Sequence, residues 1–454
     1  MAAEFGKLAM NSAAKAKDAQ GNVLSGATAE SMKLYDEAIR GFCLVYGDPL
    51  GQVEAALKIA PGCAMAHLAK AWMLTLSNDP GFLRTAKTVV AGAHDLTMNE
   101  REQAHYAALK LATAGSRRAA VAVLDRHLMS YPRDLVAHVV AAFLDINLGR
   151  TPLERDRVGR TLMFWSKDEP GYGIVLALHG FGLEEAGDYG RAEDESRAAV
   201  DLEPHNFFPH HTVTHVMEMT DRPEDGVGWM TAREPFWSAA ENGMRSHIWW
   251  HKSLFHLELG QCDDALALYD GPILHTMRPI GTMLTDAAAL LWRLDTLGCN
   301  VGNRWRDLLP IWEGHADGKC LMFTDMHAAM VELRSGNEAL VDRRLGWMRE
   351  TAASSAEAAP LYRDVGVPLV EGLVAFHQGA YDRAVDRLYG IRYDLWQIGG
   401  SNAQRDVIDW TLTEAAVRSG QRDVAVALSY ERLGTRPRSA VNRRFQREAE
   451  RIDD

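Results

Sequence analysis

The sequence has 454 residues, of which 47% are apolar, and it carries a formal net charge of −12. This composition supplies a large hydrophobic core, and the negative charge argues against nucleic acid or an anionic membrane as the main partner. No apolar run is long enough to cross a bilayer, and no secretory signal peptide opens the chain. We therefore expect a cytoplasmic protein with no nucleic-acid partner and no membrane partner.

The cysteines agree with a reducing compartment. The chain has five of them, and none forms a CxxC pair; they are Cys43, Cys63, Cys262, Cys299 and Cys320. An odd number at wide spacing favours free thiols over disulfides or a thiolate zinc site.

Internal repeats organise the chain. The segment 173–204, GIVLALHGFGLEEAGDYGRAEDESRAAVDLEP, carries a tetratricopeptide pattern in which Gly187 lies in the turn and Pro204 ends the unit. Related turns recur at 114–132, 259–271, 335–345, 378–391 and 419–437. Repeats of about 34 residues with this pattern are helix–turn–helix units that stack on their neighbours.

Strand patterns are absent, so the sequence predicts an all-α protein: a tetratricopeptide-like α-solenoid, that is, a right-handed superhelix of helix pairs. Whether the superhelix closes around a central pocket is left open. The predicted organisation has four parts: a loosely ordered tail at 1–30, degenerate repeats at 31–170, central repeats at 171–300 and C-terminal repeats at 301–454.

Two histidine-rich helices lie in the central repeats. HHTVTHVMEM (210–219) places His211 and His215 four residues apart with Glu218 on the same face, and HIWWHKSLFHLELG (247–260) repeats the spacing with His247 and His251. Buried imidazoles need hydrogen-bond partners, so four of them are costly as core filler. We expect both pairs to converge in one pocket, with Glu218 holding a ring tautomer. The alternative is that each ring bonds to nearby backbone.

The chemistry expected of this group is general acid–base catalysis, because imidazole titrates near neutral pH. His211, His215, His247 and His251 are the candidate catalytic residues, and Trp250 is a candidate ligand contact. Four imidazoles could also bind Zn²⁺ or Fe²⁺, but metal and cofactor content stay unknown. HExxH, GxSxG, P-loop and GxGxxG motifs are absent.

A second group of candidates lies in IGGSNAQRDV (398–407). Ser401 or Asn402 can cap the following helix, whose N-terminus offers backbone N–H groups to an anion. Gln404, Arg405 and Asp406 add donors and a carboxylate. We expect this turn to bind an anionic group; simple capping is the alternative.

Asp325 and His327 in MFTDMHAAM are further ligand-binding candidates. Two residues apart, they do not share a helix face. The alternative is a helix-terminal carboxylate and a packed histidine. Asp286 is interpreted as part of a structural ion pair, and His179 as a core histidine.

The motifs HHTVTHVMEM, HIWWHKSLFHLELG, MLTDAAALLWRL, MFTDMHAAM, RDVGVPL and IGGSNAQRDV occur in this order between about 176 and 431. In these motifs the chain resembles the tetratricopeptide repeat protein 38 family and its bacterial relatives. The resemblance implies an α-solenoid and singles out the same residues, but it implies no reaction.

Two functions follow. In the first, a His-rich concave interior binds a small anionic or polar molecule and transforms it by acid–base chemistry, as a hydrolase or lyase. In the second, the groove binds a peptide as an interaction scaffold without catalysis. The aromatic residues Phe207, Phe208 and Trp249 beside the histidines favour the first. Whether the protein is an enzyme, and whether it forms a homo-oligomer, are left open.

Overall fold

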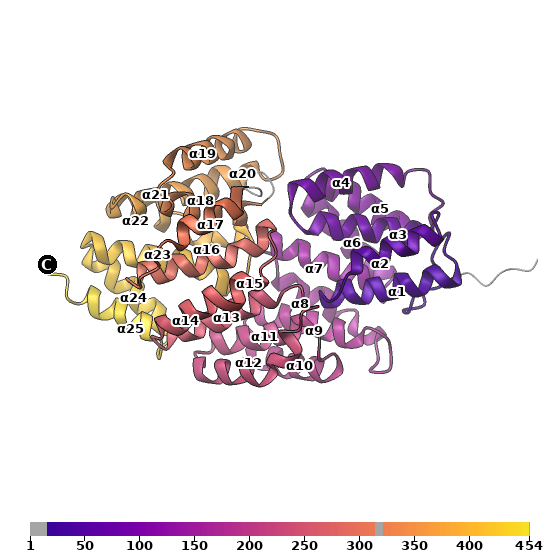
Figure 1. Ribbon diagram of the computed structural model, residues 1–454, viewed down its shortest axis with the longest axis horizontal. Coiled ribbons are helices and arrows are strands. Elements are labelled where there is room, and N and C mark those ends of the chain that lie inside the picture. Colours follow the sequence, from indigo (N-terminus) through magenta and orange to yellow (C-terminus); the bar gives the residue numbers. More distant parts are fainter. Residues whose placement is uncertain (1–15, 314–320, 454) are drawn as a thin grey trace, which may run out of the picture.

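The computed structural model describes residues 16–313 and 321–453, which fold almost wholly into helices (Figure 1). Within these ranges the only β pairing is two isolated bridges, Lys17 with Val23 and Tyr46 with Asn242. The predicted all-α class is therefore confirmed. Among the helices so described, none combines the length and the apolar character that crossing a bilayer requires.

The helices follow one another in pairs along the chain. The first eight are α1 (Ala29–Leu44), α2 (Pro49–Ile59), α3 (Ala64–Leu76), α4 (Pro80–Gly92), α5 (Glu100–Thr113), α6 (Arg117–Ser130), α7 (Leu135–Asn147) and α8 (Pro152–Gly159), followed by the 3₁₀ turn η1 (Leu162–Phe164). The central ones are α9 (Tyr172–Glu185), α10 (Tyr189–Leu202), α11 (Phe207–Met219), α12 (Pro223–Trp237), α13 (Arg245–Glu258), α14 (Cys262–Leu268), η2 (Tyr269–Ile273), α15 (Leu274–Thr276), α16 (Gly281–Thr296) and α17 (Arg304–Glu313). The last are α18 (Met322–Arg334), α19 (Glu338–Ala352), α20 (Ala359–Leu361), η3 (Tyr362–Gly366), α21 (Val367–His377), α22 (Tyr381–Tyr389), η4 (Arg392–Ile398), α23 (Asn402–Ser419), α24 (Arg422–Thr435) and α25 (Ala440–Ala449).

The turn inside each pair has one recurring geometry. After α9 the chain turns through Gly187, whose φ is 84°, and after α11 it turns through Asp221 at φ 57°. This left-handed conformation ends the first helix and lets the second fold back against it. The first helices of successive pairs pack side by side, so that α9, α11, α13 and α16 form one continuous layer. The fold is thus a tetratricopeptide-like array of helix pairs.

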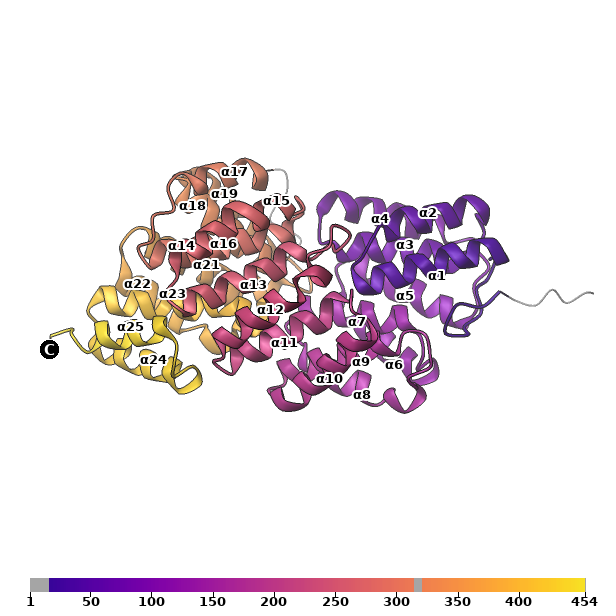
Figure 2. The same ribbon diagram turned by 60° about the horizontal axis from the view of Figure 1, so that its bottom comes forward.

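The array folds back on itself. Helix α23 contacts α11 and α16, which precede it by more than a hundred residues. The Gly400 N–H donates a hydrogen bond of 3.1 Å to the Ile146 carbonyl. A Cβ added to Gly149 would lie 1.6 Å from the Trp396 carbonyl oxygen, so only glycine permits this approach. The turn before α23 therefore contacts the C-terminal end of α7. In Figure 2 the early repeats (indigo and purple) lie on the right and the late repeats (orange and yellow) on the left.

Covalent structure differs from the sequence prediction at one pair. Cys262 at the start of α14 and Cys299 after α16 form a disulfide, whereas Cys43 and Cys63 are buried free thiols. Cys320 lies outside the described residues. The prediction of five free thiols is wrong because the two cysteines, distant in sequence, lie on adjacent repeats. The cytoplasmic location stays a prediction, now without support from the cysteines.

Candidate histidine site

The repeat period brings the two histidine pairs together. His211 and His247 are separated by 36 residues, and so are His215 and His251. Helices α11 and α13 are first helices of consecutive pairs and pack against each other. Residues one repeat apart therefore occupy equivalent positions on adjacent helices, and the i, i+4 spacing places both members of each pair on the shared face.

The four imidazoles meet through their Nε2 atoms. The distance is 3.0 Å between His211 and His247, 3.2 Å between His247 and His251, and 3.2 Å between His251 and His215. All four rings are buried. The predicted convergence of both pairs is confirmed, at shorter distances than the pocket width expected from sequence.

Carboxylates lie behind three of the rings, at Nδ1. Glu184 Oε2 is 3.2 Å from His215 Nδ1, Glu218 Oε2 is 3.3 Å from His251 Nδ1, and Asp286 Oδ2 is 2.8 Å from His247 Nδ1. Each carboxylate comes from the helix layer that also carries the histidines: Glu184 from α9, Glu218 from α11 and Asp286 from α16. By contrast, the Nδ1 atom of the fourth ring, His211, is buried without a hydrogen-bond partner.

These carboxylates test the sequence interpretation. Glu218 lies at a ring nitrogen, as expected. Asp286, interpreted as half of a structural ion pair, instead contacts the His247 imidazole. Glu184 was not predicted from the sequence. The pattern that could have indicated it is the pair of acidic residues at the end of an otherwise apolar first helix, one repeat before the histidines.

Burial sets the protonation of the cluster. It holds the pKa of His211 and His251 well below the usual value, with neighbouring imidazoles adding to the effect, and it lowers the pKa of His215 to about 4. Burial also raises the pKa of Glu184 to about 8 and that of Glu218 to about 7. Neutral imidazole is thus the favoured state of His211, His215 and His251 at neutral pH.

Aromatic side chains fix the ring orientations. The Trp250 indole stacks on His247 at a centroid distance of 5.4 Å and an interplanar angle of 14°. Phe207 stacks on His211 at 4.8 Å, and Phe181 contacts both rings of the first pair. The predicted site residue Trp250 therefore lies against the cluster, where it is fully buried.

One side of the cluster opens on a cleft. The cleft has a volume of about 710 Å³, and His211 and His247 are among the residues that line it. Its walls come from early, central and late repeats and include Phe42 of α1, Phe143 of α7 and Phe208 of α11. Apolar atoms dominate the walls because the repeats pack by their apolar faces. The point where the array folds back on itself is thus also the point where the histidines become accessible.

The turn 398–407 contributes to this cleft only in part. Ser401 and Gln404 line it, and they form a capping box at the start of α23. The Arg405 guanidinium donates to the Gly400 carbonyl and to Asn402 Oδ1 at 2.7 Å. Asp406 is turned away from the cleft.

Asp406 lies in an ionic network with C-terminal arginines. Its carboxylate accepts hydrogen bonds from Arg432 at 2.9 Å and from Arg436 at 2.7 Å. Burial opposes ionisation, but the two guanidinium groups hold the pKa of Asp406 well below its usual range. This predicted ligand contact therefore packs α23 against α24.

Asp325 and His327 do not reach the cluster. Asp325 accepts hydrogen bonds from Arg344 Nη1 and from the Tyr362 hydroxyl, each at 2.6 Å. The Nδ1 atom of His327 lies 2.8 Å from the Phe323 carbonyl of its own helix. Neither side chain lines the cleft. They hold α18 against its neighbours.

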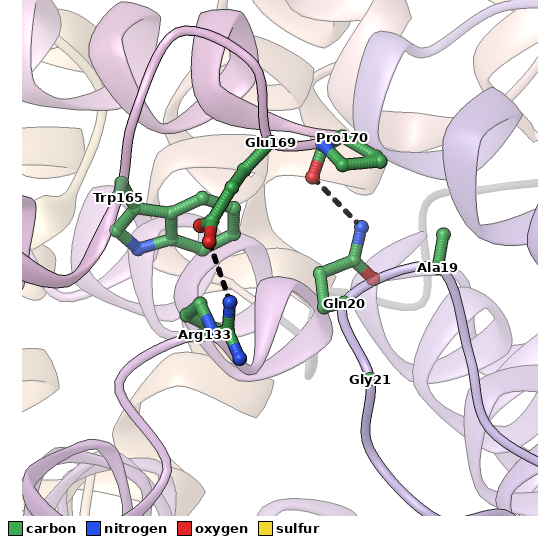
Figure 3. A pocket seen from close by; sticks show the side chains of 7 residues that line it. All are labelled: Ala19, Gln20, Gly21, Arg133, Trp165, Glu169 and Pro170. Carbon is green, nitrogen blue, oxygen red and sulfur yellow. Dashed lines mark hydrogen bonds and ion pairs between the residues drawn. The ribbon is translucent and has the colours of Figure 1, made fainter.

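A smaller depression lies far from the histidines, near the N-terminal segment (Figure 3). Two contacts join its polar groups: Arg133 pairs with Glu169 at 2.6 Å, and the Gln20 amide donates to the Pro170 carbonyl at 3.0 Å. The second carboxylate oxygen of Glu169, Oε2, is buried without a hydrogen-bond partner. It measures about 270 Å³ and contains no titratable cluster. The histidine-lined cleft is the better candidate site.

No family model matches the chain. It is similar at the level of its helical array to solved structures of IFIT1: a monomeric mutant with Gppp-AAAA (TM-score 0.43, 12% identity, 94% of this chain and 96% of that one) and the human dimer with m7Gppp-AAAA (TM-score 0.43, 12% identity, 92% and 94%). A third is the human IFIT1 dimer with PPP-AAAA, at 11% identity. Membership of the tetratricopeptide repeat protein 38 family stays a prediction.

The exclusion of nucleic acid made from net charge is corrected by these structures. The similar IFIT1 structures are of complexes with PPP-AAAA and m7Gppp-AAAA, and two of them are of dimers. The expectation of no nucleic-acid partner is therefore withdrawn. We assign no nucleic-acid ligand to this chain.

Proposed function

We propose that this protein binds a small organic molecule in the cleft between its early and late repeats, and that the histidine cluster acts on the bound molecule. The observation that carries the proposal is the position of His211 and His247, which belong both to the cluster and to the wall of the cleft. A volume of about 710 Å³ falls within the range of small-molecule sites.

The lining residues define the class of ligand. The walls are mainly apolar, so the ligand has an apolar body. Arg278 is the one fully charged cationic side chain among the described lining residues, and it is exposed to solvent. Ser401 and Gln404 add polar groups near the N-terminus of α23, which favours negative charge. An apolar molecule with one anionic or strongly polar group fits this combination.

The cluster supports proton transfer as its chemistry. An imidazole that is neutral at neutral pH has a free ring nitrogen that can accept a proton, and a carboxylate behind the ring stabilises the resulting charge. Hydrolysis and elimination are the reaction classes that need only such groups. Peptide binding without catalysis is the alternative, and the contact between Gly400 and Ile146 favours a compact ligand over an extended chain.

Binding is tested with anilinonaphthalene sulfonate, a fluorescent anion with an apolar body. Met283 lines the cleft without belonging to the cluster, so Met283→Trp should fill the cleft and weaken dye binding by about tenfold or more. Met163 is 82% exposed and lies outside the cleft, so Met163→Trp is the matched control and should bind as the wild type does. Equal affinities in the two variants would contradict the proposed binding site.

Chemistry is tested separately with para-nitrophenyl butyrate. Turnover that is lost in His247→Gln but kept in the buried-histidine control His179→Gln supports acid–base action by the cluster. Dye binding to the cleft without any cluster-dependent turnover would reject the catalytic half of the proposal while leaving the binding half intact.

A further inference from the structure

The close contacts among the four imidazoles limit which ring nitrogens can carry a proton. Three close Nε2–Nε2 contacts link the rings in the order His211, His247, His251 and His215. A hydrogen bond between two nitrogens needs one proton on one of them. Without it, two lone pairs face each other. Because each Nε2 atom carries either a proton or a lone pair, this row of three contacts needs protons on alternate rings, which makes two in all.

The carboxylates determine how many of these protons are present. When ionised, Glu184, Glu218 and Asp286 each accept an N–H from the ring in front of them, so Nδ1 carries the ring's single hydrogen. The Nε2 atoms of these three rings are then bare.

Only His211, whose Nδ1 has no partner, is free to place its hydrogen on Nε2. That hydrogen satisfies the contact with His247. The contacts from His247 to His251 and from His251 to His215, each 3.2 Å long, still join lone pairs. One further proton, on Nε2 of His251, would serve both contacts, and it would require a protonated Glu218 at Nδ1 of that ring. A divalent cation instead gives every Nε2 lone pair a partner and leaves the carboxylates ionised.

We propose that His211, His215, His247 and His251 bind one divalent transition-metal ion through their Nε2 atoms. This inference rests on the proposed function in one respect, since it names the cofactor of the same site. With the ion bound, the Nε2 atoms are its ligands, so the ion takes the place of imidazole as the reactive group. The ligand set is four imidazole nitrogens, which suits Zn²⁺ and also Fe²⁺, Ni²⁺ or Cu²⁺.

The distances fit such an ion. Zinc–nitrogen bonds of about 2.0–2.1 Å in a tetrahedral site place the ligand nitrogens about 3.3 Å apart. The separations along the row His211, His247, His251 and His215 are 3.0, 3.2 and 3.2 Å. His211, His247 and His251 offer ligand atoms that all lie within 4.8 Å of one another, and His215 adjoins this group through His251. Histidine ligands of metals commonly donate their second N–H to a carboxylate, which fixes the tautomer and the ring orientation. Three of these four rings have that carboxylate.

The ligands are not equivalent. His215 and His251 lie inside the protein, whereas His211 and His247 line the cleft. His211 also lacks a carboxylate at Nδ1, so it is the ligand held least firmly. A molecule in the cleft can therefore approach the ion from the His211 side. Because four imidazoles fill a tetrahedral shell, the ion would polarise a carbonyl or activate a water molecule only by taking a fifth ligand or by releasing His211.

The test is metal binding by untagged protein. Full-length protein is treated with a chelator, and Zn²⁺ and Co²⁺ are then added alone and in competition with a chelating dye. We expect one equivalent per chain, a tetrahedral Co²⁺ spectrum, and a loss of affinity of at least about a hundredfold in His251→Gln. Glu218→Gln should lose about 10- to 100-fold. The control His179→Gln changes a buried histidine that pairs with Glu195 and should bind as the wild type does.

Wild-type protein that binds neither ion, or His251→Gln that binds as the wild type does, would overturn the proposal. If His251→Gln does not fold, Glu218→Gln and the Co²⁺ spectrum of the wild type decide the question. Metal binding and dye binding can fail independently. Met283→Trp should bind the metal but not the dye, whereas metal-free wild-type protein should still bind the dye.

Discussion

Two buried histidine clusters in this protein have similar compositions and opposite geometries. In the first, Asp134 lies at the centre: its Oδ2 atom is 2.6 Å from Arg101 Nε, 3.0 Å from His105 Nε2 and 2.9 Å from His127 Nε2. The Trp72 indole donates to His105 Nδ1 at 3.1 Å, which places the ring proton on Nε2, toward the carboxylate. In this cluster the ring nitrogens face a carboxylate oxygen, so the hydrogen bonds around His105 are complete without a metal ion.

In the second cluster the arrangement is inverted. The carboxylates lie at the periphery and the Nε2 lone pairs point inward. Both clusters contain three His or Asp ligand atoms close enough to hold a metal ion. What separates a structural network from a binding site is therefore which ring nitrogen faces the carboxylate. Substitutions in the two clusters should therefore have different effects on stability and on metal binding.

The largest effect on stability is expected in the first cluster. Asp134→Ala leaves Arg101 buried without its main partner, and it should reduce the free energy of unfolding by about 3–5 kcal/mol, measured with urea. Burial raises the pKa of Asp134, but Arg101 and the two imidazoles lower it well below its usual range. The stabilisation is therefore present above the unfolded pKa of about 3.9 and is lost as pH falls through the lower, folded value. A variant as stable as the wild type at neutral pH would contradict this role.

Metal should stabilise only the second cluster. At a free metal concentration of about one hundred times Kd, Zn²⁺ should raise the free energy of unfolding of the wild type by about 3 kcal/mol. Asp134→Ala should show the same increment, because its cluster does not take part, whereas His251→Gln should show none. The opposite result, in which Asp134→Ala loses the increment and His251→Gln keeps it, would mean that the first cluster binds the metal.

The clusters also differ in how the chain builds them. The first lies within consecutive helices, whereas the cleft beside the second depends on contact between Gly149 and the carbonyl of Trp396. Gly149→Ala introduces a clash and a left-handed alanine, and we expect it to cost at least about 2 kcal/mol and to weaken dye binding. Gly420→Ala is the matched control, because Gly420 has φ 75° but nothing within 4 Å of an added Cβ. It should cost about 1 kcal/mol and leave dye binding unchanged.

The smallest effect is expected at the ion pair of Figure 3. The side chains of Arg133 and Glu169 are 45% and 30% exposed, so water screens the attraction between their charges. Glu169→Gln should change the free energy of unfolding by less than about 1 kcal/mol. A loss as large as that of Asp134→Ala would mean that burial is not what distinguishes the Asp134 network.

The sequence predicted the helical array and the meeting of the two histidine pairs, because both follow from local periodicity. Turn spacing defines the repeat, and equal positions in consecutive repeats lie side by side. The outer carboxylates were harder to predict from the sequence. Glu184 and Asp286 come from the flanking repeats, and whether they point toward the histidines depends on how the helix layer curves.

The turn at 398–407 shows a different limit. Its two glycines and polar residues suggested an anion site, but Gly400 bonds to α7 and Arg405 and Asp406 are engaged in packing. Of the predicted ligand residues in this turn, Ser401 and Gln404 line the cleft, beside Gly400. Contact between segments 250 residues apart leaves no periodic trace in sequence. The folding back of the array, and therefore the cleft, could not be predicted from repeat spacing.

The central claim is that the inward Nε2 atoms form a metal site, and a crystal structure of zinc-loaded protein tests it most directly. Data collected on both sides of the zinc absorption edge should show one anomalous peak at about 2.0–2.1 Å from the Nε2 atoms of His211, His215, His247 and His251. The cluster around Asp134 should show none. A peak elsewhere, or an ordered cluster that stays without zinc in protein saturated with the ion, would contradict the account.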